Sequence, residues 1–243
     1  MKLNINSPAY VIGFAAIISA IFTAAIMSLH AMARPTVEAN EQSFRQRALV
    51  DVFALDDGKT LSDAEVGQLY AKSIRPIDRA ISDRETGVVF NVPPGEGSPH
   101  SPRTYRAVVI DEQTGTETLL GYAFPVWGVG FWARIDGYLA VSNDLEKSLG
   151  IVFVSHTETP GLGGRITERT WRKQFAGLDL SEPTASGQVI YIGGQAAGPL
   201  RKDRHVDAVT GATGTSRAVE AFLRIRIAEF RRAMSADRRK ESL

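Results

Sequence analysis

The 243-residue chain contains no cysteine. This absence excludes disulfides, cysteine-ligated zinc and iron–sulfur centres, and a cysteine nucleophile. Charge of one sign is also lacking, because 28 lysines and arginines nearly balance 27 aspartates and glutamates and leave a formal net charge of +1. Charge therefore indicates neither a nucleic acid nor an acidic surface as partner, and we expect no nucleic-acid binding.

The familiar signatures of nucleotide binding and hydrolysis are missing as well. No G-x-G-x-x-G follows a predicted strand, no G-x-x-x-x-G-K-[ST] occurs, and no G-x-S-x-G accompanies Ser155-His156. The histidines lack the spacing of metal ligands; they are His30, His100, His156 and His205. We expect neither a metal site nor a catalytic residue acting on its own.

A long apolar run near the N-terminus is the first feature that is present. Residues Ala9 to Leu29 carry no charge and, as a helix, span about 31 Å, which matches a bilayer core of roughly 30 Å. Ser7-Pro8 is a typical helix start. Ala31-Met32-Ala33 resembles a signal-peptidase site, but the run is longer than the apolar region of a signal peptide. We therefore predict a retained single-pass anchor, with the N-terminus inside and the following domain outside.

The remainder is predicted to form one α+β domain with a mainly antiparallel sheet. Residues 35–40 should connect the anchor to a helix over 41–55, and Ser62-x-x-Glu65 is a capping box that starts a second helix ending near Pro76. Residues 91–102 are expected to form a loop. The predicted division is an anchor region (1–34), a helical juxtamembrane region with a loop (35–104), the α+β domain (105–234) and a frayed polar tail (235–243).

Alternating and β-branched residues predict five strands in this domain. These strands are expected over 105–110, 117–124, 134–141, 149–155 and 188–192. A short helix is expected over 167–175. A longer helix is expected over 215–234, because apolar residues recur along one side of it, at Val219, Leu223, Ile227, Phe230 and Met234.

The segment directly before the last helix could bind a phosphate group. The segment reads Asp207-Ala-Val-Thr210-Gly211-Ala212-Thr213-Gly-Thr215-Ser216. Small neighbours leave the Thr213 hydroxyl open to approach, and the glycines permit tight turns. A phosphate there would meet free N–H groups at the positive end of the helix dipole. The alternative is an ordinary turn, with Thr215 or Ser216 capping the helix.

A second glycine-rich segment follows an apolar strand. In Glu158-Thr159-Pro160-Gly161-Leu162-Gly163-Gly164, one proline and three glycines would let the chain wrap closely around a ligand. Glu158 offers a hydrogen-bond acceptor, Thr159 a hydroxyl, and Leu162 an apolar surface for a ring. The alternative is a plain strand-to-helix loop.

Aromatic residues gather between these strands. Six of them occur within 17 residues: Tyr122, Phe124, Trp127, Phe131, Trp132 and Tyr138. The Trp127-Gly-x-Gly-x-Trp132 segment could line a pocket or dock a partner, although core packing is the commoner role of each ring.

These residues resemble a known family. One FMN-binding domain carries its flavin through a phosphodiester bond to the last threonine of a D-x-x-[ST]-G-A-T pattern. The segment before the last helix is similar to that pattern, as Asp207-x-x-Thr210-Gly211-Ala212-Thr213. The second signature of the same domain resembles Glu158-Thr-Pro-Gly-Leu-Gly163. With the anchor and the tryptophan segment, the chain resembles the C subunit of Na+-translocating NADH:quinone reductases. The G subunit of the Rnf electron-transport complex shares both motifs and is the nearest alternative; a membrane-anchored binding or assembly module without a redox role is another.

The resemblance implies a cofactor, its contacts and a location. FMN would be attached covalently to Thr213 by a separate flavin transferase, with Asp207, Thr210, Gly211 and Ala212 forming the attachment motif. The isoalloxazine site would include Glu158, Thr159, Gly161, Leu162 and Gly163. The chain would lie in the bacterial inner membrane with its main domain in the periplasm. Together with other subunits, the chain would relay electrons from NADH oxidation towards quinone, and this electron flow would be coupled to sodium export. The chain would not oxidise NADH itself. In such a protein the cofactor supplies the chemistry.

Overall fold

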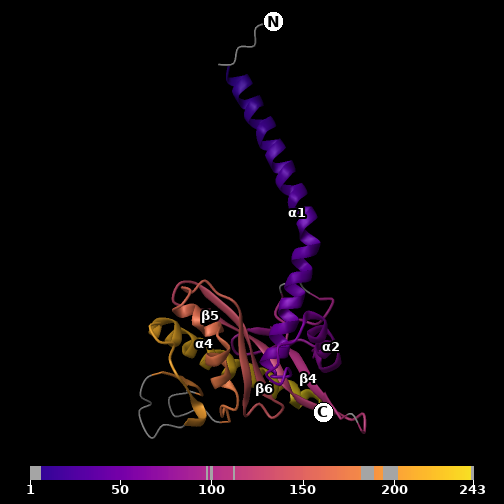
Figure 1. Cartoon of the computed structure of the whole chain (residues 1–243), viewed down its shortest axis with the longest axis vertical. Coiled ribbons are helices and arrows are strands. Elements are labelled where there is room, and N and C mark those ends of the chain that lie inside the picture. Colours follow the sequence, from indigo (N-terminus) through magenta and orange to yellow (C-terminus); the bar gives the residue numbers. More distant parts are fainter. Residues whose placement is uncertain are drawn as a thin grey trace. The chain divides into compact units, whose positions relative to one another are not determined.

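The structure is a computed structural model that describes residues 7–96, 98, 101–111, 113–181, 189–193 and 202–241. It consists of two compact units, residues 1–44 and residues 45–243. The first unit contains most of one helix, and the second contains the sheet and every other element (Figure 1).

Helix α1 (Pro8–Val52) is a continuous helix of 45 residues. It begins as predicted, with the Ser7 hydroxyl accepting a hydrogen bond from the Tyr10 N–H at 3.2 Å. Among the described residues it is the one helix long and apolar enough to cross a membrane, with a mean hydropathy of 2.2 over its most apolar stretch. Its residues 8–44 are all exposed.

The predicted connection over residues 35–40 was wrong, because α1 continues through Pro35. A proline within a helix costs one backbone hydrogen bond. Strong helix formers on both sides offset this cost, and an ion pair of 2.7 Å between Arg34 and Glu38 bridges the turn that contains the proline. The last turns of α1 belong to the second unit, where Leu49 and Val52 are buried.

Helix α2 (Asp63–Ser73) starts with the predicted capping box between Ser62 and Glu65. Three short strands follow that had not been predicted: β1 (Ile74–Pro76), β2 (Ile81–Ser82) and β3 (Val89–Asn91). Runs of two or three residues are too short to show a period of two, so their sequences carry no recognisable strand pattern.

The predicted antiparallel sheet is confirmed. Its strands lie in the order β1-β4-β5-β6-β7, and each neighbouring pair is antiparallel. The long strands are β4 (Tyr105–Ile110), β5 (Glu117–Val129), β6 (Arg134–Ser142) and β7 (Ser148–Ser155). Strand β5 continues past its predicted end at Phe124, because Pro125 stays in register with Tyr138 and the pairing runs on to Val129 and Arg134.

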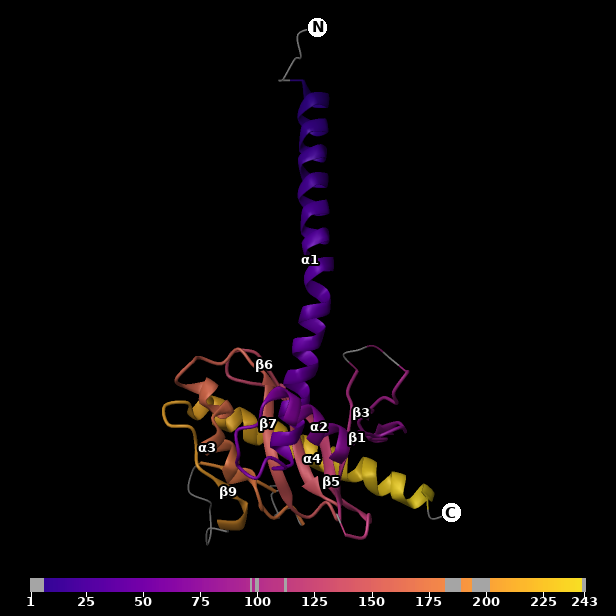
Figure 2. The same ribbon diagram turned by 45° about the vertical axis from the view of Figure 1, so that its right-hand side comes forward.

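Two apolar cores lie on opposite faces of this sheet (Figures 1 and 2). Helix α4 (Thr213–Glu241) covers the larger core. The five apolar positions that the sequence predicted on this helix are all buried. The smaller core is covered by the last turns of α1 and by α2. The tail predicted to fray after residue 234 is helical to Glu241; an ion pair between Asp237 and Arg79 holds this end of the helix.

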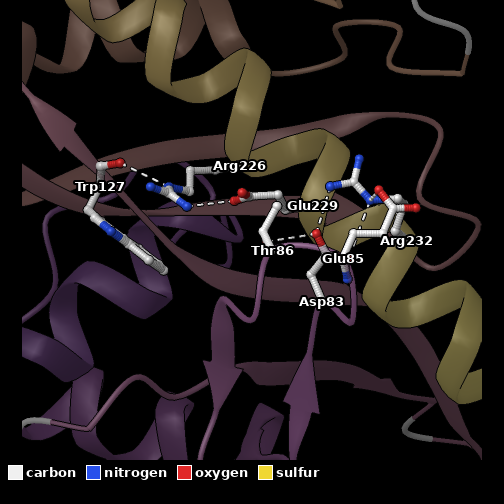
Figure 3. A network of polar contacts seen from close by, with 7 residues as sticks. All are labelled: Asp83, Glu85, Thr86, Trp127, Arg226, Glu229 and Arg232. Carbon is white, nitrogen blue, oxygen red and sulfur yellow. Dashed lines mark hydrogen bonds and ion pairs between the residues drawn. The ribbon is translucent and has the colours of Figure 1, made fainter.

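Polar contacts fix the outer side of α4 (Figure 3). Arg232 contacts the buried Asp83 carboxylate at 2.6 Å, and this contact lowers the pKa of Asp83 below its ordinary value. Six residues earlier, Arg226 pairs with Glu229 at 2.6 Å and lies 4.3 Å from the ring centre of Trp127. Trp127 therefore belongs to the packing of α4.

Short elements connect β7 to α4. These are η1 (Gly163–Thr167), α3 (Arg169–Arg172), η2 (Lys173–Phe175), β8 (Tyr191–Ile192), η3 (Lys202–Arg204) and β9 (His205–Val206). The single helix predicted over 167–175 is thus a series of short helical turns. Of the strand predicted over 188–192, residues 191 and 192 form β8, which pairs in parallel with β9, and residue 188 lies outside the described residues.

Candidate functional site

The Asp207–Thr213 motif forms the turn that leads into α4. Side chains of the preceding short helices hold its first residue: Trp171 Nε1 donates to the Asp207 carbonyl at 2.7 Å, and the Asp207 N–H donates to Gln174 Oε1 at 2.9 Å. Gly211 then adopts a φ of +77°, in the left-handed region that favours glycine. The chain turns here and Thr213 becomes the first residue of α4.

Three hydroxyl groups at this helix start differ in their surroundings. Thr213 is exposed, whereas Thr215 and Ser216 are 3% and 1% exposed. The Ser216 hydroxyl accepts from the Val209 N–H at 3.0 Å, and the Thr215 hydroxyl donates to Glu158 Oε2 at 2.6 Å. The expectation that one of them caps the helix was therefore wrong, since both lie inside α4 and are engaged elsewhere. Of the three, only the Thr213 hydroxyl faces solvent.

The start of α4 also retains backbone donors. In the described part of the chain, no hydrogen bond is made by the backbone N–H groups of Thr213, Gly214 or Thr215, and the first bond of the helix runs from the Ser216 N–H to the Ala212 carbonyl at 3.0 Å. Free N–H groups and the positive end of a helix dipole favour an anion at this point. An anion bound there would lie next to the Thr213 hydroxyl.

The second predicted motif lies against this turn. Its backbone folds back on itself, with the N–H groups of Leu162 and Gly164 both donating to the Thr159 carbonyl at 3.1 and 3.0 Å. Gly161, with a φ of +74°, lies within this loop. Leu162 is close to Gly211, since a side-chain carbon placed on that glycine would lie 3.1 Å from Leu162 Cδ2. The structure thus brings together two motifs that are about 50 residues apart in the sequence.

Glu158 points into the protein rather than towards solvent. Its side chain is 4% exposed, and its Oε1 accepts from the N–H groups of Phe131 at 2.8 Å and Trp132 at 3.1 Å. Its Oε2 accepts from Thr215. The carboxylate therefore connects the turn between β5 and β6 to the first turn of α4. The sequence predicted the segment from Trp127 to Trp132 as a possible pocket lining through its side chains, but not that the backbone of residues 131 and 132 donates to Glu158.

Exposed apolar side chains border the same place. Leu162, Phe131 and Trp132 are 46%, 62% and 67% exposed. Phe131 packs over Gly214, where a side-chain carbon would lie 2.4 Å from the ring, and Trp132 Nε1 donates to the Thr159 hydroxyl at 3.1 Å. Large exposed rings are costly in water and are typical of surfaces that bind a ligand or a partner. They offer an apolar surface beside Thr213.

A cavity adjoins the turn. It has a volume of about 190 Å³ and is lined by Asp207, Thr210 and the two residues between them, together with residues of the short helices such as Arg165 and Thr170. Asp207 and Thr210 thus line this cavity, and Leu162 does not. Of the described residues, no three His, Asp or Glu side chains come together as they would to hold a metal ion.

The aromatic cluster predicted from the sequence is divided by the fold. Phe124 is fully buried and Tyr122 nearly so, both in the larger core, and Tyr138 packs against the smaller one. Trp127 contacts Phe90 and Arg226. Only Phe131 and Trp132 lie at the candidate site.

Comparisons with known proteins show which families this part of the chain resembles. The FMN-binding domain family matches residues 130–225, which contain both motifs and the turn after β5. The chain is 31% identical over 204 residues to the C subunit of the Na(+)-translocating NADH-quinone reductase of Pseudomonas aeruginosa, covering 82% of this chain and 74% of that protein. It is 26% identical over 238 residues to the protein of the same name from Haemophilus ducreyi, covering 90% and 89%.

Solved structures share the fold. The crystal structure of NqrC from Shewanella oneidensis matches with a TM-score of 0.60 and 25% identity, covering 82% of this chain and 98% of that one. The crystal structure of the C subunit of the Na(+)-translocating NADH-quinone reductase from Parabacteroides distasonis also matches with a TM-score of 0.60, at 19% identity, over 82% of this chain and 95% of that one.

Proposed function

This chain belongs to the family formed by the C subunits of Na(+)-translocating NADH-quinone reductases, and we propose that it carries FMN covalently on Thr213 and relays electrons within such a complex. The observation that carries the proposal is the exposed Thr213 hydroxyl at the start of α4, beside free backbone N–H groups. The neighbouring hydroxyls of Thr215 and Ser216 are buried and hydrogen-bonded, which disfavours them as attachment points.

The residues present fit FMN. The N-terminal turn of α4 would hold the phosphate, and the glycine at position 211 leaves room for it because it carries no side chain. Leu162 and Trp132 would contact the isoalloxazine ring: both are exposed, Leu162 lies close to Gly211, and Trp132 donates to Thr159 in the same loop as Leu162. The bound flavin would supply reversible uptake and release of electrons.

Attachment requires an activated flavin, because joining a phosphate monoester to an alcohol in water is unfavourable. In the proposed reaction, Thr213 Oγ1 forms a bond to the FMN phosphorus of flavin adenine dinucleotide. The anhydride bond breaks, AMP leaves, and the hydroxyl proton passes to a base of the transferase. This chain contributes the positioned hydroxyl, and a separate flavin transferase supplies the catalysis.

The rest of the chain supports a role as one subunit among several. The sequence contains no nicotinamide-binding signature, so electrons would come from NADH oxidation by another subunit and pass on towards quinone, coupled to sodium export. Helix α1 would anchor the chain in the bacterial inner membrane. With the N-terminus in the cytoplasm, the flavin domain would lie in the periplasm, where the transferase would act.

The proposal is tested by replacing the acceptor. The full chain is produced together with the transferase, and flavin that remains on the denatured protein is measured by fluorescence and by mass. We expect Thr213→Val to abolish this flavin. The control is Thr170→Val, which alters another threonine of the same region, on α3, and should keep it.

Two results would contradict the proposal. Flavin bound covalently to the Thr213→Val chain would show that another residue is the acceptor. A wild-type chain that stays colourless after co-production with the transferase would reject the redox function and favour an anchored module without a cofactor.

A further inference from the structure

The buried carboxylate of Glu158 connects two elements that approach Thr213 from different sides. Oε1 holds the backbone of Phe131 and Trp132 in the turn between β5 and β6, and Oε2 holds the Thr215 hydroxyl in α4. Thr215 lies 57 residues away in the sequence. A buried carboxylate that accepts three hydrogen bonds is satisfied, and removing either side of the Glu158–Thr215 contact leaves a buried polar group unpaired.

Close packing leaves this connection little freedom. A side-chain carbon on Gly163 would lie 2.5 Å from Thr215 Oγ1 and 2.7 Å from Glu158 Oε2, and one on Gly130 would lie 2.5 Å from Glu158 Oε1. These distances are well inside normal contact, so a side chain at position 130 or 163 would displace the carboxylate or its neighbours. Glu158 is held in one orientation by its hydrogen bonds and by its neighbours.

We propose that Glu158 is a positioning residue for flavin attachment, which holds the first turn of α4 so that the Thr213 hydroxyl is presented to the transferase. This inference rests on the proposed function. Thr213 and Thr215 belong to the same helical turn, so fixing the side chain of Thr215 also fixes the backbone that carries Thr213. The same contact keeps the Thr215 hydroxyl occupied and buried, which leaves Thr213 as the accessible one.

In this proposal Glu158 therefore acts through its contacts within the protein rather than by touching the flavin. Its two oxygens are engaged by the protein, whereas the side chains of Leu162 and Trp132 are exposed at the site. The hydrogen bonds, rather than the negative charge, are what the arrangement uses. An amide at position 158 can keep them, because a threonine hydroxyl both donates and accepts and can turn to accept from the amide N–H.

The test uses two matched pairs of variants. Glu158→Ala and Thr215→Val each remove the connection, whereas Glu158→Gln and Thr215→Ser each preserve it. Full-length, flavin-free chain in detergent is mixed with the transferase and flavin adenine dinucleotide, and the initial rate of covalent attachment is measured at several chain concentrations. Near-ultraviolet circular dichroism and the thermal midpoint show that each variant is folded.

We expect attachment to slow on the order of tenfold or more in Glu158→Ala and Thr215→Val, because a hydrogen bond to a charged group is lost. The loss should appear in kcat rather than KM, since the surface that the transferase binds is unchanged. Glu158→Gln and Thr215→Ser should stay within about threefold of the wild type. Adding Thr215→Val to Glu158→Ala should slow attachment little further, because Glu158→Ala already removes the contact with Thr215.

The inference is overturned if Glu158→Ala and Thr215→Val accept flavin at the wild-type rate, or if Glu158→Gln is as slow as Glu158→Ala. These outcomes differ from failure of the proposed function. If the wild-type chain carries no flavin on Thr213, the proposed function fails, whereas a wild-type rate in Glu158→Ala on a chain that does carry it rejects this inference alone.

Discussion

The two long helices of this protein show how differently one secondary structure can be used. In α1, residues 8–29 are apolar on all sides and exposed. In α4, a single apolar stripe is buried against the sheet. A helix without a polar face needs an apolar solvent, whereas an amphipathic helix needs an apolar partner surface.

The two helices also start differently. The Ser7 side chain caps α1. At the start of α4, Thr215 and Ser216 turn their hydroxyls into the protein and leave the first N–H groups of the described helix without acceptors. Because side-chain caps satisfy such groups at little cost, a helix start that lacks one is free to bind an anion. The first helix is therefore specialised along its length, and the second at its first turn.

Replacing one phenylalanine in each helix should give the largest difference between the two helices, measured as the change in the free energy of unfolding. Phe230 in α4 is 1% exposed and stacks on Phe124 with ring centres 3.8 Å apart, whereas Phe22 in α1 is 63% exposed. We expect Phe230→Ala to lower the free energy of unfolding by about 3–5 kcal/mol and Phe22→Ala to leave it unchanged. Denaturant unfolding in detergent, followed by fluorescence, measures both, since all three tryptophans lie in the second unit. Equal losses would contradict the distinction.

A charge placed in the middle of α1 tests whether this helix requires an apolar solvent. We expect Ile17→Arg to weaken membrane insertion by about 2.5–3.5 kcal/mol on the insertion scale, because the charge lies at the centre of the apolar run. Leu29→Arg, at the end of the run, should cost less, since a long side chain can reach the polar interface there. The fraction of chain that resists extraction at alkaline pH measures the effect. Full retention of Ile17→Arg would argue against a spanning helix.

The smallest effect concerns the outer side of α4 and depends on pH. Arg232 lowers the pKa of Asp83, so the contact stabilises the fold above the ordinary carboxyl pKa, and this contribution is lost as the pH falls through the lowered value. We expect Asp83→Asn to cost about 1–2 kcal/mol at neutral pH, a modest value because Arg232 is partly exposed. Below about pH 4, near the ordinary carboxyl pKa, the difference from the wild type should shrink. Thermal midpoints measured from neutral pH down to about pH 3 test this, and a constant difference would contradict it.

Local patterns predicted most of the fold. Strand β4 occupies its predicted residues, and the buried stripe of α4 follows from its period, since both depend on short-range alternation of apolar and polar residues. Errors occurred where another contact overrides a local breaker. Pro35 continues α1 with help from the Arg34–Glu38 pair, and Pro125 stays in β5 because β6 pairs with it.

The candidate site was predictable in its parts but not in its assembly. Glycines and small residues near Thr213 and Leu162 marked both loops, and the resemblance assigned them to one flavin site. The contact between Glu158 and Thr215 joins residues 57 positions apart, and no local pattern indicates which side chain turns inward. The resemblance assigned Glu158 to the isoalloxazine site, and the fold adds that its carboxylate is buried against Thr215.

The two glycines beside this carboxylate limit how the site can change over evolutionary time. Loops that bind ligands commonly vary while their chemistry is kept, but a single methyl group at position 130 or 163 would overlap Glu158 or Thr215. The missing side chains are thus as much a requirement of the site as the hydroxyl it presents. Divergent relatives of this protein should keep glycine at positions 130 and 163 even where the surrounding surface has changed.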